Sequence, residues 1–238
     1  MRRQKMLMLA LLLAGINMIS GSAQTTNNQK PEEGTQEGKQ NKKIEISGGV
    51  LVESNYSSFV HSGIGGGKSV MKPGVTTGGF LNLGISKHFS IQPELLLHYK
   101  ESEFGRNNQN GIYRYWGMEI PIYAMYHTKL KNGHRIHIGI GPYTEFGLDA
   151  SLKREGEKID LYEKNTESGT PVMRDSNSGF GIINSYEFPF GLLINVSYKI
   201  SISNLLDANE SSAALHPQTF SLGFAYCFRK SKHTKDET

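Results

Sequence analysis

Apolar and polar residues alternate along two segments of this chain, residues 89–99 and 116–126. Every second residue of the first segment is apolar or aromatic, namely Phe89, Ile91, Pro93, Leu95, Leu97 and Tyr99. The positions between them are mostly polar or charged: Ser90, Gln92, Glu94, Leu96 and His98, followed by Lys100. Successive side chains of a β-strand point to opposite faces, so the pattern predicts strands with one oily and one polar face.

The alternation recurs and predicts eight strands, over residues 44–53, 74–86, 88–100, 111–127, 133–148, 179–188, 190–203 and 217–229. Longer and shorter connections alternate between them: 54–73, Lys87, 101–110, 130–133, 149–178, Pro189 and 204–216. Outer-membrane barrels combine short periplasmic turns with longer outer loops. We therefore expect an all-β fold, an eight-stranded antiparallel up-and-down transmembrane β-barrel in the cell outer membrane, with both chain ends on the periplasmic side.

A soluble β-sandwich or lipocalin-like barrel is the competing interpretation of the same strands. In such a fold the apolar face would be the inside face. Glu94, Glu119 and Glu145 lie in the middle of strands beside glycines and tyrosines, and a soluble barrel offers them no clear place. In a membrane barrel the apolar face contacts lipid, and these carboxylates point inward and can pair.

The first 23 residues have the features of a cleaved secretory signal peptide. Arg2, Arg3 and Lys5 precede the apolar run 6–13, and small residues precede Gln24. The alternative, an uncleaved anchor helix, would need a longer apolar run. The expected organisation is a signal peptide (1–23), a disordered periplasmic linker (24–43), the barrel (44–229) and a periplasmic tail (230–238).

Composition narrows the classes of protein further. The mean hydropathy is −0.42, and no helix-length apolar run follows the leader, which argues against a helical membrane protein. The net charge of +4 falls to about +1 without the leader, because the leader holds three basic residues and no acid. No basic surface for nucleic acid is therefore expected. Cys227 is the single cysteine, so no disulfide forms within the chain.

Charged and titratable residues on the inward strand faces form a candidate lumen network. Its members are Glu45, Glu94, His98, Glu119, His137, Glu145, Glu187, Lys199 and Arg229. Small barrels are filled by their own side chains, and buried charges must pair to avoid a large desolvation cost. We expect a salt-bridge plug. The alternative is a path for protons or ions, or an acid–base pair.

Motifs for catalysis or metal binding are weak. No HExxH or CxxC spacing occurs, so neither a metal nor another cofactor is expected. The glycine run 63–67, followed by Lys68 and Ser69, lacks the phosphate-loop spacing. His88, Ser90 and Glu94 lie close together but form no esterase motif. The chain is therefore not expected to be an enzyme.

Short sequence motifs resemble the PorT-type outer-membrane β-barrel family of Bacteroidetes. They are Gln92–Leu97 (QPELLL), Glu119–Ile122 (EIPI), Gly139–Tyr143 (GIGPY), Ile202–Leu205 (ISNL) and Tyr226–Phe228 (YCF). The resemblance spans about residues 44–229 and implies an eight-stranded outer-membrane barrel. It also suggests an accessory role in protein secretion.

The expected function is structural or as an interaction partner, possible partners being envelope or secretion-system proteins and outer-membrane lipids. Segments 54–73 and 149–178 would form the outward contact surfaces, and the second is rich in charge. The alternatives are a small channel or an envelope-lipid-modifying enzyme such as a deacylase.

Overall fold

A computed structural model describes the barrel part of the chain. It describes residues 45–62, 68–106, 109–154, 156–163, 171, 173–205 and 214–228. Among these residues, no helix is long and apolar enough to cross a membrane. The predicted signal peptide, linker and tail lie outside the described residues and stay predictions.

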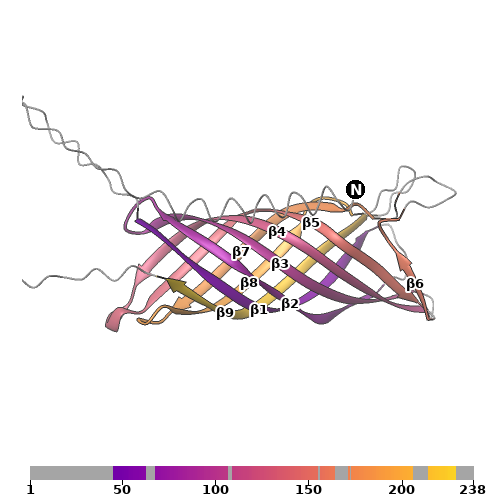
Figure 1. Ribbon diagram of the computed structural model, residues 1–238, viewed down its shortest axis with the longest axis horizontal. Helices are drawn as coiled ribbons and strands as arrows, with labels where there is room; N and C mark the ends of the chain where they lie inside the picture. The colour runs from indigo at the N-terminus through magenta and orange to yellow at the C-terminus, as the bar shows by residue number, and fades with distance from the viewer. Residues whose placement is uncertain are drawn as a thin grey trace, which may run out of the picture. The chain divides into compact units, whose positions relative to one another are not determined.

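Eight long strands form one closed antiparallel ring (Figure 1). They are β1 (Glu45–Ser62), β2 (Lys68–Gly84), β3 (Phe89–Arg106), β4 (Gln109–Lys129), β5 (Arg135–Arg154), β7 (Ser176–Glu187), β8 (Leu192–Ser201) and β9 (Ala214–Phe228). The order around the ring is β4-β3-β2-β1-β9-β8-β7-β5, and the β4–β5 pairing closes it. A short strand, β6 (Glu157–Asp160), pairs with the end of β5, and a 3-10 turn, η1 (Lys131–Gly133), joins β4 to β5. The predicted eight-stranded barrel is confirmed.

We call the end of the barrel that holds Glu45 and Phe228 the terminal end. The opposite end, which holds Ser62, Arg106 and Arg154, is the loop end. Turns at the terminal end are short: residues 85–88, 130–134 and 188–191. Gly191 in the last of them has a φ of 93°, a conformation that favours glycine over other residues.

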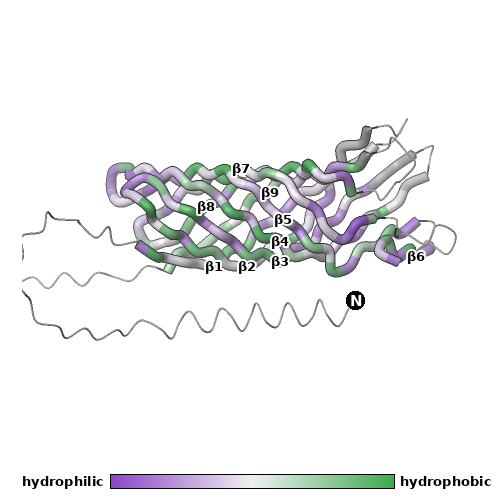
Figure 2. Tube along the Cα trace, turned by 90° about the horizontal axis from the view of Figure 1, so that it is seen from above, coloured by the Kyte–Doolittle hydropathy of each residue, from purple (hydrophilic) through white to green (hydrophobic). Residues whose placement is uncertain are grey.

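Burial alternates along the strands as the sequence predicts. In β7 each residue from Ser176 to Glu187 is alternately exposed and buried. In β9 the exposed face carries Phe220, Leu222, Phe224, Tyr226 and Phe228. Hydrophilic and hydrophobic residues alternate along the strands in Figure 2. The apolar side chains therefore lie on the outside of the barrel, which excludes the soluble alternative, where the inside face would be apolar.

Side chains and backbone atoms of other strands lie close to glycines in the barrel. Tyr123 on β4 is 1% exposed. A Cβ atom at Gly181 would lie 2.9 Å from the Tyr123 hydroxyl oxygen, and one at Gly141 would lie 1.9 Å from the Ile122 carbonyl oxygen. Toward the terminal end, an apolar cluster also lies in the interior. It comprises Leu51, Phe80, Leu96, Leu193, Ala225 and Cys227. Side chains, and no wide channel, thus fill these parts of the interior.

The prediction of a long loop over 54–73 is wrong, because β1 continues to Ser62 and β2 begins at Lys68. The pairing of β2 with β3 shifts register between Met71 and Val75. This bulge contains Pro73, which has no backbone N–H, and it interrupts the alternating pattern. Asn55 donates a hydrogen bond across it to the Tyr99 carbonyl oxygen, at 3.0 Å.

The predicted loop 101–110 is also largely strand, and the predicted loop 149–178 contains strand at both ends and the whole of β6. β5 continues to Arg154 and β6 follows, while β3 runs to Arg106 and β4 begins at Gln109. Leu148 is an extra residue in β5, since Trp116 pairs with Asp149 and Gly117 with Gly147. Beyond this bulge the outer face becomes charged, so the strand continues without the apolar signal that the prediction needs. The predicted one-residue link at Lys87 is instead a four-residue turn. Here the strand is shorter than predicted, because the pairing of β2 with β3 ends at Gly84.

Candidate functional site

The barrel interior holds the charged residues that the sequence singled out. Seven of the nine candidate residues are buried there: Glu94, His98, Glu119, His137, Glu145, Glu187 and Lys199. Glu45 is instead exposed. It begins β1, where it pairs with Gly84 of β2. Arg229 lies outside the described residues.

Two lysines and two glutamates cross the middle of the lumen, and we call them the cross-lumen layer: Lys100, Glu119, Glu145 and Lys199. Lys199 on β8 forms an ion pair with Glu119 on β4. These strands are not neighbours in the ring, because β7 and β5 lie between them on the shorter way round. Lys100 on β3 contacts Glu145 on β5 at 3.0 Å and Glu119 at 3.8 Å. The layer thus connects separate walls of the barrel.

Polar side chains complete the hydrogen bonding around this layer. His98 lies 2.8 Å from Glu145, and Asn177 donates to the same carboxylate at 3.1 Å. Asn195 donates to Glu53 at 3.3 Å, and Gln92 donates to Glu94 at 2.8 Å. Removing water from a carboxylate is costly unless such donors replace it. The interior carboxylates are therefore held by lysine, histidine and amide groups.

A second polar group lies near the terminal end, and we call it the terminal relay: Ser90, His127, His137 and Glu187. Ser90 contacts Nε2 of His127, the Nδ1 atoms of His127 and His137 face each other, and Nε2 of His137 lies 2.7 Å from Glu187. One proton arrangement satisfies all three contacts with both imidazoles neutral. Ser90 donates to His127, His127 donates to His137, and His137 donates to the Glu187 carboxylate.

The terminal relay follows neighbouring strands rather than crossing the lumen. Its residues lie on β3, β4, β5 and β7, which are consecutive in the ring. His127 and His137 are direct cross-strand partners. Asn82 on β2 donates to the Ser90 hydroxyl at 2.9 Å, so the hydrogen bonds extend over one more strand. The arrangement is a belt along part of the wall.

Sequence reasoning missed three of these groups. His127 is the last residue of the predicted strand 111–127 and is absent from the candidate network, but it lies within β4, which runs on to Lys129, and its ring contacts Ser90. Lys100 and Glu53 are buried although neither was included in the candidate network. Each lies two positions from an inward-facing residue, Lys100 from His98 and Glu53 from Leu51. Strict alternation along the strand would therefore have placed both inside.

The chemistry of the described interior is that of ion pairs and hydrogen bonds. Among the described residues, no group of three or more His, Cys, Asp or Glu side chains is placed to hold a metal ion. Breaking a buried ion pair leaves an uncompensated charge, so each pair in the cross-lumen layer favours the closed arrangement.

Comparison with known proteins identifies the family. A model of the outer membrane protein beta-barrel domain matches residues 23–207. No curated protein matches the chain. Solved structures similar to it include Ail of Yersinia pestis (12% identity, 77% of this chain and 99% of that chain, TM-score 0.41). OprG of Pseudomonas aeruginosa is another (11%, 78% and 95%, TM-score 0.44). The match over most of its length places this chain in the outer membrane protein beta-barrel domain family, and the protein is located in the outer membrane.

Proposed function

We propose that this protein is a closed, non-conducting barrel that acts through protein contacts at its loop end, as an accessory to protein secretion. The observation that carries the first part is the Lys199–Glu119 ion pair, which connects β8 to β4 across the lumen. The secretion role rests on the short motifs that resemble the PorT-type family. In this proposal the terminal end faces the periplasm and the loop end faces outward.

The β5–β6 hairpin is the surface that fits a partner best. It continues the barrel wall at the loop end and presents Lys153, Arg154, Glu157 and Lys158, all of which are exposed. Such mixed charge favours fast, specific association with a surface of complementary charge. The partner we propose is a protein of the cell envelope that belongs to the secretion machinery.

A photo-crosslinking residue at Lys158 tests this contact in living cells. We expect a crosslink to a secretion-machinery protein, and we expect deletion of the chain to reduce export of the cargo. The matched control is Lys131, which is exposed in η1 at the terminal end and should give no crosslink to the same protein. No crosslink from position 158 or 153, together with normal export, would overturn the proposal.

Planar-bilayer recording tests whether the barrel is closed. The purified protein should show no steady conductance, because the cross-lumen layer occupies the interior. The control is Lys199→Ala combined with Glu119→Ala, which removes both partners of the crossing pair. Steady, ion-selective conductance in the unmodified protein would favour the channel alternative and contradict the closed barrel.

The terminal relay supports a second candidate, an acyl hydrolase. In this reaction the Ser90 oxygen attacks an ester carbonyl and passes its proton to His127, which returns the proton to the departing alcohol. Water then attacks the acyl-serine and releases the acid. His137 and Glu187 would orient His127 and stabilise its charged form, because the contacts run from Ser90 through His127 and His137 to Glu187.

A fluorophosphonate probe distinguishes this candidate from a structural belt. An acyl hydrolase should be labelled at Ser90, and His127→Gln should abolish labelling while leaving the barrel folded. The matched control is Ser185→Ala, another buried serine of the interior, which should leave labelling unchanged. A hydrolase must admit its ester to Ser90, which is 3% exposed in this structure, so absence of labelling in the intact protein would remove the hydrolase.

A further inference from the structure

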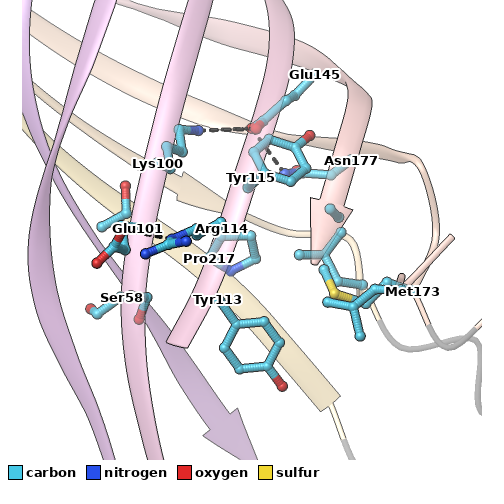
Figure 3. Close-up of a pocket in the computed structure, with 15 residues that line it drawn as sticks. Ser58, Lys100, Glu101, Tyr113, Arg114, Tyr115, Glu145, Met173, Asn177 and Pro217 are labelled. Atoms are coloured by element: carbon cyan, nitrogen blue, oxygen red, sulfur yellow. Dashed lines mark hydrogen bonds and ion pairs between the residues drawn. The ribbon is translucent and has the colours of Figure 1, made fainter. Parts of the chain in front are cut away.

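A cavity lies at the loop end, beyond the cross-lumen layer. It encloses about 470 Å³, part of it open to solvent. Lys100, Glu145 and Asn177 border it on one side, and Tyr113 and Met173 lie on the other (Figure 3). Within it, the space open to the centres of water molecules is about 40 Å³. Since one water needs about 10–15 Å³ by this measure, the cavity holds a few waters or one compact ligand.

Apolar side chains from two connections and from the start of β9 gather beside this cavity, and we call them the loop-end cap: Leu161, Met173, Leu205 and Leu215. They pack with Ala150 in one buried cluster, and Leu161, Met173, Leu205 and Ala150 line the cavity itself. Backbone hydrogen bonds connect these residues in pairs. Met173 N–H donates to Leu161 at 3.0 Å, and Leu205 N–H donates to Leu215 at 3.1 Å. The apolar wall is thus a built part of the fold.

The charged groups at the cavity floor already have protein partners. The Lys100 ammonium donates to both oxygens of Glu145, at 3.0 and 3.1 Å. His98 and Asn177 contact the same carboxylate. A charged ligand would lose its water here and would have to compete with these internal pairs. The floor therefore favours a ligand without charge.

Two tyrosines add polar groups that are themselves uncharged. Tyr113 lines the cavity, and Tyr162, in the connection after β6, packs against the apolar cluster. Burial raises the pKa of the Tyr162 hydroxyl above its usual value, so that this phenol stays neutral. Tyr115, which packs against the same apolar cluster, also lines the cavity.

From these observations we infer that the loop-end cavity is a binding site for a neutral, predominantly apolar small molecule. The loop-end cap and Tyr113 contact its apolar body, and the paired floor excludes anions and cations of the same shape. Binding removes apolar surface from water, which is the main driving force in such a cavity. This inference does not depend on the proposed secretion partner, and either can fail without the other.

Methyl NMR of the protein in lipid nanodiscs tests the site directly. The barrel has four methionines, Met71, Met118, Met125 and Met173, and Met173 lines the cavity. With methyl-labelled methionine and indole as the neutral probe, we expect a saturable shift of the Met173 signal. Met118, which lies on the outer face beside Leu97 and Phe146, should respond linearly, as indole partitions into lipid. Indole-3-acetate, the charged analogue, should not produce the saturable shift.

Cavity-filling variants complete the test. Leu161→Trp should weaken indole binding at least tenfold, and Leu222→Trp on the lipid-facing side is the matched control. Heat-modifiable gel mobility checks that each variant folds. If Leu161→Trp does not fold, Ala150→Leu fills the same cavity from the barrel wall. A Met173 shift that stays linear, or binding unchanged in a folded cavity-filling variant, would overturn the inference.

Discussion

The cross-lumen layer and the terminal relay are both buried and polar, but they join the barrel in different directions. In the cross-lumen layer, Lys199 and Glu119 come from strands that are not neighbours. In the terminal relay, His127 and His137 are direct partners on adjacent strands. The first arrangement fixes the distance between walls, and the second reinforces pairing that the backbone already provides.

This difference explains why the two groups have different chemistry. A contact across the lumen must span a wide gap, and long charged side chains such as lysine and glutamate can reach that far. A contact between adjacent strands needs short reach and directional hydrogen bonds, for which serine and histidine are suited. We therefore expect the cross-lumen layer to contribute more to stability per residue than the terminal relay.

The largest loss should follow removal of one partner of the crossing pair. Glu119→Leu should lower the free energy of unfolding by about 3–5 kcal/mol, because the Lys199 ammonium stays buried without its main partner. Urea unfolding in lipid vesicles, followed by heat-modifiable gel mobility, measures this loss.

The double variant Glu119→Leu with Lys199→Met is the control for this prediction. Since it removes both charges, it should recover most of the lost stability. If the double variant were as unstable as the single one, the loss would come from packing around Glu119, and the contrast between the two groups would disappear.

A smaller loss is expected in the terminal relay. His137→Leu should cost about 1.5–3 kcal/mol, the usual range for a hydrogen bond to a charged group, here the Glu187 carboxylate. The same urea titration measures it. Lys87→Leu, at an exposed turn position, should stay within about 0.5 kcal/mol of the unmodified protein. A loss at His137 equal to that at Glu119 would contradict the ranking.

The wall of the barrel could be predicted from sequence because one rule governs it. Strand side chains alternate, so the parity of Glu94, Glu119 and Glu145 places all three inside once the oily face is assigned to lipid. The rule fails where the pattern is interrupted. The extra residue Leu148 shifts the parity of β5, and the bulge at Pro73 hides the continuation of β2.

The partners within the lumen could not be predicted from parity. That Lys199 meets Glu119 depends on the register of the strands between them around the ring, and that His127 meets His137 depends on the geometry of the turn that joins β4 to β5. The loop-end cap is harder still to predict from the sequence, because Leu161, Met173 and Leu205 come from connections without a periodic pattern. Local alternation carries no information about either.

Amide support of the interior carboxylates should have a modest effect. Asn195→Ala removes the hydrogen bond to Glu53, which is longer than that of His137, 3.3 Å against 2.7 Å, and should therefore cost only about 1 kcal/mol. Asn184→Ala, on the exposed face of β7, is the matched control and should change stability by less than about 0.5 kcal/mol. Equal losses at Asn195 and Asn184 would show that burial of the amide does not decide its contribution.

The smallest effect, and the sharpest test of the comparison, is Ser90→Ala. It should cost only about 0.5–1 kcal/mol, because Asn82 keeps its contact with Gln92 and His127 keeps its contact with His137. Combined with His137→Leu, it also shows whether the belt acts as one unit. In a connected belt, His127 loses its orientation when His137 is replaced, so Ser90→Ala should then cost almost nothing more. If the two losses simply add, the contacts are independent, and the terminal relay is a row of separate hydrogen bonds rather than a coupled group.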